Sequence, residues 1–134
     1  MGIAKKIVVL AALGLMLAAC RVEPVYEVKN RPLPTVAQKA LNPSQLERTF
    51  IDAAMARNWR VEVVAPGHIR ASMVLRGKHT AITDIYFTRN GYSLLLNSTQ
   101  NLKQDSSGKI HRTYNNLVRA LETEIENRLY RASY

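Results

Sequence analysis

The sequence predicts an α+β domain in which two helices cover one face of a four-stranded antiparallel sheet. Three observations lead to this fold class. A helix-start signal near residue 42 is followed by apolar residues at helical spacing, the period changes to two between about residues 59 and 97, and helical spacing returns from about residue 110. A chain of 134 residues with 47% hydrophobic residues suits one such domain. We expect a two-layer sandwich in the order helix, meander, helix.

The first 19 residues predict an export signal. Lys5 and Lys6 form a short positive region, and residues 7–19 form an apolar run of about thirteen residues. As a helix this run spans roughly 20 Å, which is short of the ~30 Å hydrocarbon core of a bilayer. It therefore suits the core of a signal peptide and not a transmembrane helix.

The end of this run carries the only cysteine of the chain, in the order Leu17-Ala18-Ala19-Cys20. These residues resemble the lipobox of bacterial lipoproteins. The resemblance implies cleavage before Cys20 and attachment of lipid, including palmitate, to that residue, which would anchor the protein in a membrane. The alternative is an ordinary signal peptide cut near Ala19, which leaves a free thiol. The residue after the cysteine is Arg21 and not Asp, which by Gram-negative sorting rules implies the outer membrane, facing the periplasm.

Residues 20–40 predict a flexible tether that starts at the lipidated cysteine. Pro24, Pro32 and Pro34 disfavour helix, and no apolar period emerges. Twenty flexible residues span roughly 25 Å on average. The tether would hold the folded domain, residues 41–134, away from the bilayer.

The first predicted helix covers residues 43–57. Asn42 can cap it, Pro43 fits its first position, and Gln45 can close a capping box. Asn58 is the predicted end. The apolar face of this helix consists of Leu46, Phe50, Ile51 and Ala54.

Four strands follow, at about residues 59–64, 69–76, 79–88 and 92–97. The turns between them are predicted at Pro66-Gly67, Gly77-Lys78 and Asn90-Gly91. Trp59, at the start of the first strand, is expected to anchor the core between the first helix and the sheet.

The register of the central strands can be tested against burial, because a one-residue slip moves every side chain to the other face. Pairing Arg76 with His79 would send apolar residues of the third strand to the solvated face. A shift by one residue instead gathers the apolar side chains on one face: Ile69, Ala71, Met73, Leu75, Ala81, Ile85, Phe87, Leu94 and Leu96. We therefore predict the shifted register, which also sets Arg70 opposite Asp84 as a cross-strand ion pair.

Residues 98–109 predict a polar loop, and residues 110–130 predict a long amphipathic helix. Its apolar face consists of Tyr114, Leu117, Val118, Leu121, Ile125 and Leu129. Glu122, Glu124 and Glu126 are expected on the solvated side, balanced by Arg119 and Arg128.

The sequence predicts no metal site, no cofactor and no catalytic residue. His68 and His79 stand near opposite ends of the predicted sheet, roughly 20 Å apart, and His111 can approach only one of them. No serine lies in a nucleophile elbow, and the glycines suit turns and not a phosphate loop. A hydrolase that uses His111 is the one enzymatic hypothesis.

The outer face of the predicted sheet carries the candidate binding residues. Ile82, Tyr86 and Leu95 are more apolar than a solvated face needs, and Arg70 and Arg76 lie beside them. The alternative interpretation is that these residues only serve strand propensity.

The second half of the chain also carries a set of polar and aromatic residues after its hairpins: Ser98, Asn101-Leu102, Ile110-His111 and Tyr114-Asn115. In this set, and in the amphipathic helix that follows, residues 45–130 resemble a group of small bacterial lipoproteins with no assigned activity. The chain departs from the group at Leu117, where the group has an aromatic residue. The resemblance draws attention to His111 and Tyr114, either as binding residues or as residues that pin the last helix to the sheet.

Together these observations predict a membrane-anchored lipoprotein, an accessory of an envelope process, whose domain binds an envelope protein through the outer sheet face or the loop 98–109. The formal net charge of +9, which is about +7 without Lys5 and Lys6, supports an alternative ligand, an anionic glycolipid or glycan bound in a salt-sensitive way. Nucleic acid is not expected as a partner of an exported protein. The sequence does not indicate an oligomeric state.

Overall fold

The computed structural model describes residues 22–75, 79–100 and 109–132. In chain order the elements are β1 (Val22–Pro24), β2 (Val28–Pro32), α2 (Thr35–Ala40), α3 (Pro43–Ala56), β3 (Arg60–Ala65), β4 (His68–Leu75), β5 (His79–Phe87), β6 (Gly91–Gln100), β7 (Lys109–His111) and α4 (Arg112–Arg131).

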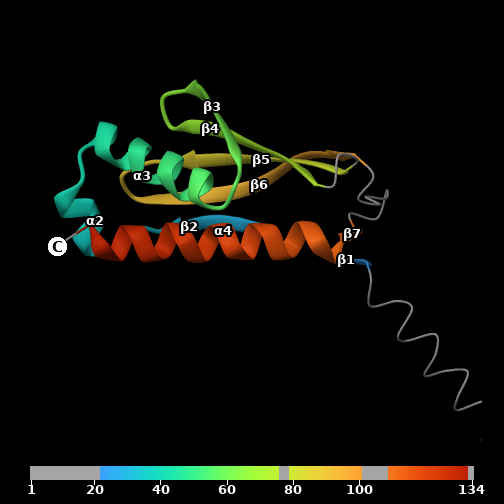
Figure 1. The fold of residues 1–134 in the computed structure, drawn as a ribbon. Helices are drawn as coiled ribbons and strands as arrows, with labels where there is room; N and C mark the ends of the chain where they lie inside the picture. Colours follow the sequence, from blue (N-terminus) through green and yellow to red (C-terminus); the bar gives the residue numbers. More distant parts are fainter. Residues whose placement is uncertain (1–21, 76–78, 101–108, 133–134) are drawn as a thin grey trace, which may run out of the picture.

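The described elements form an α+β fold. An antiparallel sheet of five strands has the order β2-β6-β5-β4-β3, and a second sheet pairs β1 with β7. Helices α3 and α4 pack on one side of the large sheet, and the small sheet lies at the start of α4 (Figure 1). The predicted α+β class is confirmed, but the large sheet has five strands instead of four. None of the helices in the described ranges is both long and apolar enough to cross a bilayer.

Helix α3 begins with the predicted capping box. The Asn42 side chain accepts a hydrogen bond from the backbone amide of Gln45, and the Gln45 side chain accepts one from the backbone amide of Asn42. Pro43 occupies the first helical position, where no amide hydrogen is needed. The helix ends before Asn58, whose φ of 67° lies in the left-handed region that asparagine tolerates.

The predicted register of the central strands is confirmed. β4 and β5 pair Met73 with Ala81 and Arg70 with Asp84. Strand β6 is longer than predicted, because residues 98–100, expected in a loop, continue it to Gln100. The strand contains a bulge at Asn97. The predicted turn at Gly77-Lys78 and the loop residues 101–108 lie outside the described residues.

The prediction of a flexible tether is wrong for residues 22–40. Strand β2 pairs with β6 at the edge of the large sheet, β1 pairs with β7, and α2 follows Pro34. The prolines do not oppose this structure, because Pro32 ends an edge strand and Pro34 stands just before the first helical residue. Val28 and Leu33 are buried, so this segment contributes to the core.

Residues 22–33, here called the strap, are held against α4 by polar side chains. Arg31 forms ion pairs with Glu122 at 3.1 Å and with Glu126 at 2.8 Å. Tyr26 donates a hydrogen bond to Glu122 at 2.8 Å. Burial alone would lower the pKa of Arg31, but the charges of Glu126 and Glu122 raise it above its ordinary value. The guanidinium therefore stays charged.

The predicted outward orientation of the α4 glutamates is consequently wrong. Glu122 and Glu126 hold the strap, and Tyr92 donates a hydrogen bond of 2.6 Å to Glu126 from the strand below. Glu124 pairs with Arg57 and Arg128 on the other side of the helix. The exposed fractions of the three side chains are 14–16%.

Asn115 connects the strap to the first turn of α4. Its fully buried amide accepts a hydrogen bond from the Tyr26 backbone at 2.8 Å and donates to the Pro24 carbonyl and to Glu23. Each such bond contributes about 1 kcal/mol, and a buried partner that is left unpaired costs more. Asn115 thereby fixes the path of the strap.

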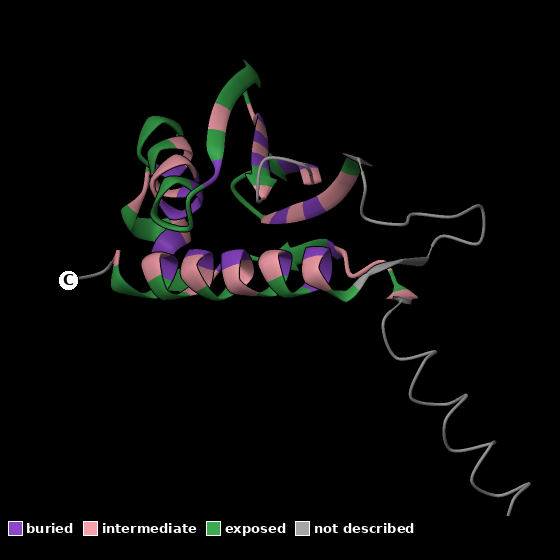
Figure 2. Cartoon of the chain, turned by 45° about the vertical axis from the view of Figure 1, so that its right-hand side comes forward, coloured by how far each residue is buried: buried purple, intermediate pink, exposed green. Residues whose placement is uncertain are grey.

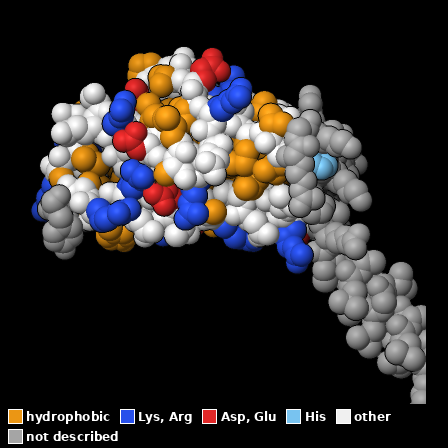
Figure 3. Space-filling view, in the orientation of Figure 1, with side chains coloured by type: hydrophobic (Ala, Val, Ile, Leu, Met, Phe, Trp, Pro, Cys, Tyr) orange, Lys and Arg blue, Asp and Glu red, His pale blue; other side chains and the backbone are white. Residues whose placement is uncertain are grey.

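The core lies between the large sheet and the sides of α3 and α4 that face it (Figure 2). Phe50 of α3 stacks on Phe87 with ring centroids 4.8 Å apart, and contacts Tyr92 at 5.3 Å. Trp59 is 3% exposed and belongs to this core, as predicted. On the outer surface of the helices, basic and acidic side chains are interspersed (Figure 3).

Candidate binding surface on the outer sheet face

The candidate site lies on the face of the large sheet opposite the helices. Because side chains alternate along a strand, the residues between the core positions of β4, β5 and β6 all point to this face. They are His68, Arg70, Ser72, Val74, Thr80, Ile82, Asp84, Tyr86, Ser93, Leu95 and Ser98, which we call the outer face. In the described ranges no helix packs on it.

A buried carboxylate organises the middle of the outer face. Asp84 is 7% exposed. Its Oδ1 accepts hydrogen bonds from His68 Nε2 at 2.8 Å and from Arg70 Nε at 3.2 Å, and its Oδ2 accepts one from Asn97 Nδ2 at 2.8 Å. We call these four residues the Asp84 cluster. Three strands contribute to it, so the cluster fixes their relative positions.

The bulge in β6 explains why Asn97 reaches Asp84. Ile82 pairs with Ser98 and Thr83 pairs with Leu96, so Asn97 has no partner across the ladder. An unpaired bulge residue bends its strand and redirects its side chain. Asn97 is turned toward Asp84 in this way.

The hydrogen bonds to Asp84 and the charge of Arg70 together outweigh the effect of burial on the pKa of Asp84. Burial alone would raise its pKa, but the hydrogen bonds from Asn97, His68 and Arg70, together with the Arg70 charge, lower the pKa below 3.8. The carboxylate is therefore ionised at neutral pH. It compensates the Arg70 guanidinium, so the centre of the outer face carries a satisfied ion pair instead of a lone positive charge.

Tyr86 continues the cluster toward the tip of the hairpin. Its ring stacks on His68, with ring centroids 4.2 Å apart and an angle of 20° between the planes. It is 41% exposed. Val74, at the other end of the face, is 59% exposed. Ile82 and Leu95 lie between them and are half-buried.

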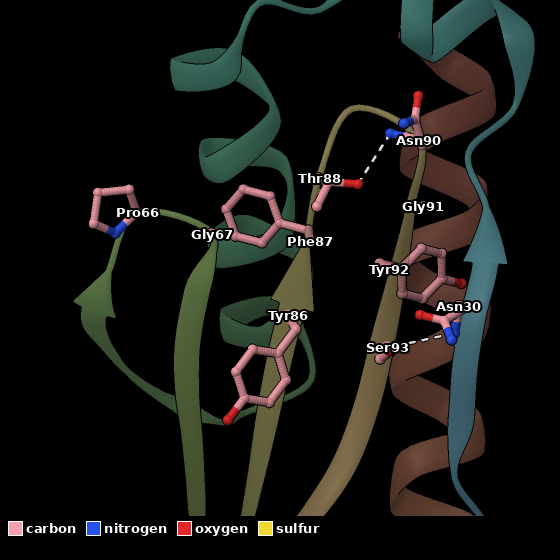
Figure 4. A pocket seen from close by; sticks show the side chains of 10 residues that line it. All are labelled: Asn30, Pro66, Gly67, Tyr86, Phe87, Thr88, Asn90, Gly91, Tyr92 and Ser93. Atoms are coloured by element: carbon pink, nitrogen blue, oxygen red, sulfur yellow. Dashed lines mark hydrogen bonds between the residues drawn. The ribbon is translucent and has the colours of Figure 1, made fainter.

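Next to Tyr86 lies an open hollow of about 410 Å³ (Figure 4). The turn between β3 and β4, the tip of the β5–β6 hairpin and Asn30 of β2 surround it, and none of the described residues that line it is charged. Ser93 accepts a hydrogen bond from the Asn30 amide at 2.9 Å and so holds β2 beside it. The hollow suits an uncharged group that can form hydrogen bonds.

Two glycines allow the strands to close around this hollow. A Cβ atom at Gly91 would lie 2.7 Å from the Arg31 carbonyl oxygen, so only glycine permits the close approach of β2. Gly67 has a φ of 79°, and a Cβ there would lie 2.9 Å from the Phe87 oxygen. The sequence predicts both positions as turns, but it does not predict their part in shaping the hollow.

The predicted binding residues are not all on this surface. Arg70, Ile82, Tyr86 and Leu95 share the outer face. Tyr114 instead is fully buried, bonds Thr83 at 3.0 Å, and has a pKa that burial raises to about 12. It pins α4 to the sheet, and its assignment as a binding residue is wrong. Cys20, Arg76 and the His111 side chain lie outside what the structure describes.

Sequence reasoning missed two members of the Asp84 cluster. His68 was considered only as a metal ligand, and that role was rejected, although the predicted register places it two residues before Arg70 on β4, diagonal to Asp84. The hydrogen bond from Asn97 to Asp84 was not predicted, because it depends on the bulge. Among the described residues, no three His, Cys, Asp or Glu side chains are grouped so that they could hold a metal ion.

Comparison with known proteins found no relative of this chain. No family model, no curated protein and no solved structure matches the chain.

Proposed function

We propose that this protein is a lipoprotein of the bacterial envelope whose domain binds another envelope protein through the outer face. Its membrane anchor would be lipid attached to Cys20, in the outer membrane facing the periplasm. The order Leu17-Ala18-Ala19-Cys20 after a charged and apolar leader supports the anchor. The resemblance of residues 45–130 to a group of small bacterial lipoproteins would imply the same location.

The observation that carries the binding function is the composition of the outer face. It combines exposed Val74 and Tyr86 with half-buried Ile82 and Leu95, on a sheet face that no described helix covers. Protein interfaces are enriched in tyrosine and arginine and depleted of unpaired charge at their centre. The Arg70–Asp84 pair gives the outer face this character, because its charges compensate each other.

The same ion pair favours a protein partner over an anionic glycolipid. The net charge of +9 favours the glycolipid. However, Arg70 is already bonded to Asp84, and the described residues that line the hollow beside Tyr86 are all uncharged. If the glycolipid version holds, binding to vesicles that contain lipopolysaccharide will weaken with salt and with Arg70→Gln plus Arg76→Gln. We expect that neither Arg70→Gln nor Arg76→Gln changes binding to these vesicles.

Anchoring through Cys20 would place the body close to the membrane. Strand β1 begins at Val22, two positions after the cysteine. The partner would therefore be met near the bilayer surface and not at the end of a long tether.

The anchor is tested by labelling growing cells with radioactive palmitate. We expect label on the wild-type chain and none on Cys20→Ala, which should appear in the soluble fraction. Unlabelled wild-type protein in the soluble fraction would refute the anchor.

The binding face is tested by photo-crosslinking in intact cells. A photoreactive amino acid is placed at Val74 on the outer face or at Met55 on α3, two positions with the same exposed fraction of 59%. We expect a discrete adduct from position 74 that disappears with Tyr86→Lys, and none from position 55. Equal adducts from both positions, or an adduct that is insensitive to Tyr86→Lys, would exclude the outer face.

A further inference from the structure

Strand β3 forms an open edge of the large sheet. Among the described residues it pairs with β4 on one side only. All six of its residues are exposed or half-buried, and Val63 and Val64 are 48% and 41% exposed. A row of unpaired backbone groups beside exposed valines is a template for another strand.

The opposite edge of the sheet is protected in ways that β3 is not. Strand β2 contains Lys29, Pro32 and a register shift near Asn30, whose φ is 51°. Arg31 also binds it to α4. Strand β3 has no proline or lysine, and its only register shift falls at its end, near Val64. Its first four residues are regular strand.

The charged side chains of β3 indicate which strand would pair with this edge. Arg60 and Glu62 are both exposed, both point to the outer face, and neither forms an ion pair within the described residues. In an antiparallel pair of two identical strands with the two-fold axis at Val61, each Arg60 lies opposite Glu62 of the second copy. Opposite charges facing each other across strands stabilise a sheet, and like charges destabilise it.

We propose that β3 pairs antiparallel with β3 of a second copy of this chain, in the register that sets Val61 opposite itself. The two large sheets then form one continuous sheet with the outer faces of both copies on the same side. Only a short strand contributes, so the contact is weak in solution. Confinement of both copies to one membrane would raise their effective concentration. The pairing itself requires neither the lipid anchor nor the partner proposed for the outer face.

The register is tested by disulfide crosslinking of the full-length chain. Across the proposed axis the two Val61 Cα atoms are roughly 5 Å apart, within the range of a disulfide, whereas the two Val64 Cα atoms are roughly 20 Å apart. We expect Val61→Cys to give a dimer on oxidation in membranes. Val64→Cys and the wild type, which retain Cys20, should give none above background. Equal crosslinking of all three chains would refute the register.

The charge pattern is tested in the Val61→Cys background. Arg60→Glu and Glu62→Arg each place like charges across the axis twice, and each should reduce crosslinking roughly tenfold. Co-expression of the two single variants with different tags should restore a mixed dimer, and the double swap should restore the homodimer. Loss of crosslinking that neither combination restores would refute the pairing, and so would a disulfide that joins position 61 to a different polypeptide.

Discussion

At the scale of single residues, Asp84 shows how one carboxylate can join three strands. It receives hydrogen bonds from His68, Arg70 and Asn97, all of which are donors at these atoms. Asp84→Asn keeps the shape of the side chain but places an NH2 donor against one of the groups that donate to Asp84. It also removes the negative charge opposite Arg70. Because hydrogen bonds to a charged group contribute about 1.5–3 kcal/mol, we expect the free energy of unfolding to fall by about 2 kcal/mol. Urea unfolding at neutral pH measures this.

Asp52→Asn is the matched control for this experiment. Asp52 forms an exposed i,i+4 pair with Arg48 on α3, and such pairs contribute about 0.5 kcal/mol or less. A loss of equal size in both variants would show that the Asp84 cluster adds no more than a surface ion pair.

The pH dependence of stability gives a separate prediction for Asp84. Its pKa is lower in the folded chain than the unfolded value of 3.8. The stabilisation is therefore complete above 3.8 and is lost as the pH falls through the folded pKa. The difference in unfolding free energy between the wild type and Asp84→Asn should shrink on acidification from neutral pH to about pH 3. A difference that is constant over this range would contradict the assigned cause.

The Asp84 cluster also marks how far sequence reasoning reaches at this scale. The Arg70–Asp84 pair followed from the register, because only one register buries the apolar side chains. The hydrogen bond from Asn97 to Asp84 could not be predicted, since a bulge depends on both strands and not on a local pattern. Tyr114 was placed on the apolar face of its helix, but its exposure could not be decided without knowing which polar group it would meet. Thr83 supplies that group.

At the scale of elements, periodic segments were predictable and the strap was not. Helices α3 and α4 and strands β3 to β6 carry their own apolar period, which is a local signal. The strap is held by contacts with residues that are about ninety positions away, such as Tyr26 with Asn115 and Glu122. Its prolines, read locally, indicated a tether. Because the strap was not predicted to pack against α4, the glutamates of α4 were predicted to be solvated.

Asn115 provides a test of the strap. Asn115→Ala removes the acceptor for the Tyr26 amide and the donor to Pro24, so buried polar groups are left unpaired. We expect a loss of about 2–3 kcal/mol in unfolding free energy, together with faster hydrogen exchange of the Tyr26 amide. Asn116→Ala changes the neighbouring exposed residue and should have an effect below about 0.5 kcal/mol. If both variants exchange at the wild-type rate, Asn115 does not hold the strap.

At the scale of the whole molecule, the strap changes how a lipid on Cys20 would orient the domain. The strap begins at Val22 and enters the fold at the start of α4, where β1 pairs with β7 (Figure 1). The C-terminal end of α4 lies at the opposite end of the helix, and its twenty residues correspond to about 30 Å. A lipid on Cys20 would then hold one end of the molecule at the bilayer.

This orientation can be measured with a dye and a quencher in the lipid headgroups. Arg112→Cys and Arg131→Cys place one thiol at each end of α4, and in the lipidated chain Cys20 does not react with a thiol dye. Because quenching falls steeply with distance, we expect strong quenching of a dye at position 112 and weak quenching at position 131. A flexible tether of twenty residues would let the domain tumble, and the two dyes would then be quenched alike. Equal quenching in a chain that carries palmitate would thus support the lipid anchor and contradict the orientation. The lipid would be attached, but the strap would not be held in the fold at the membrane.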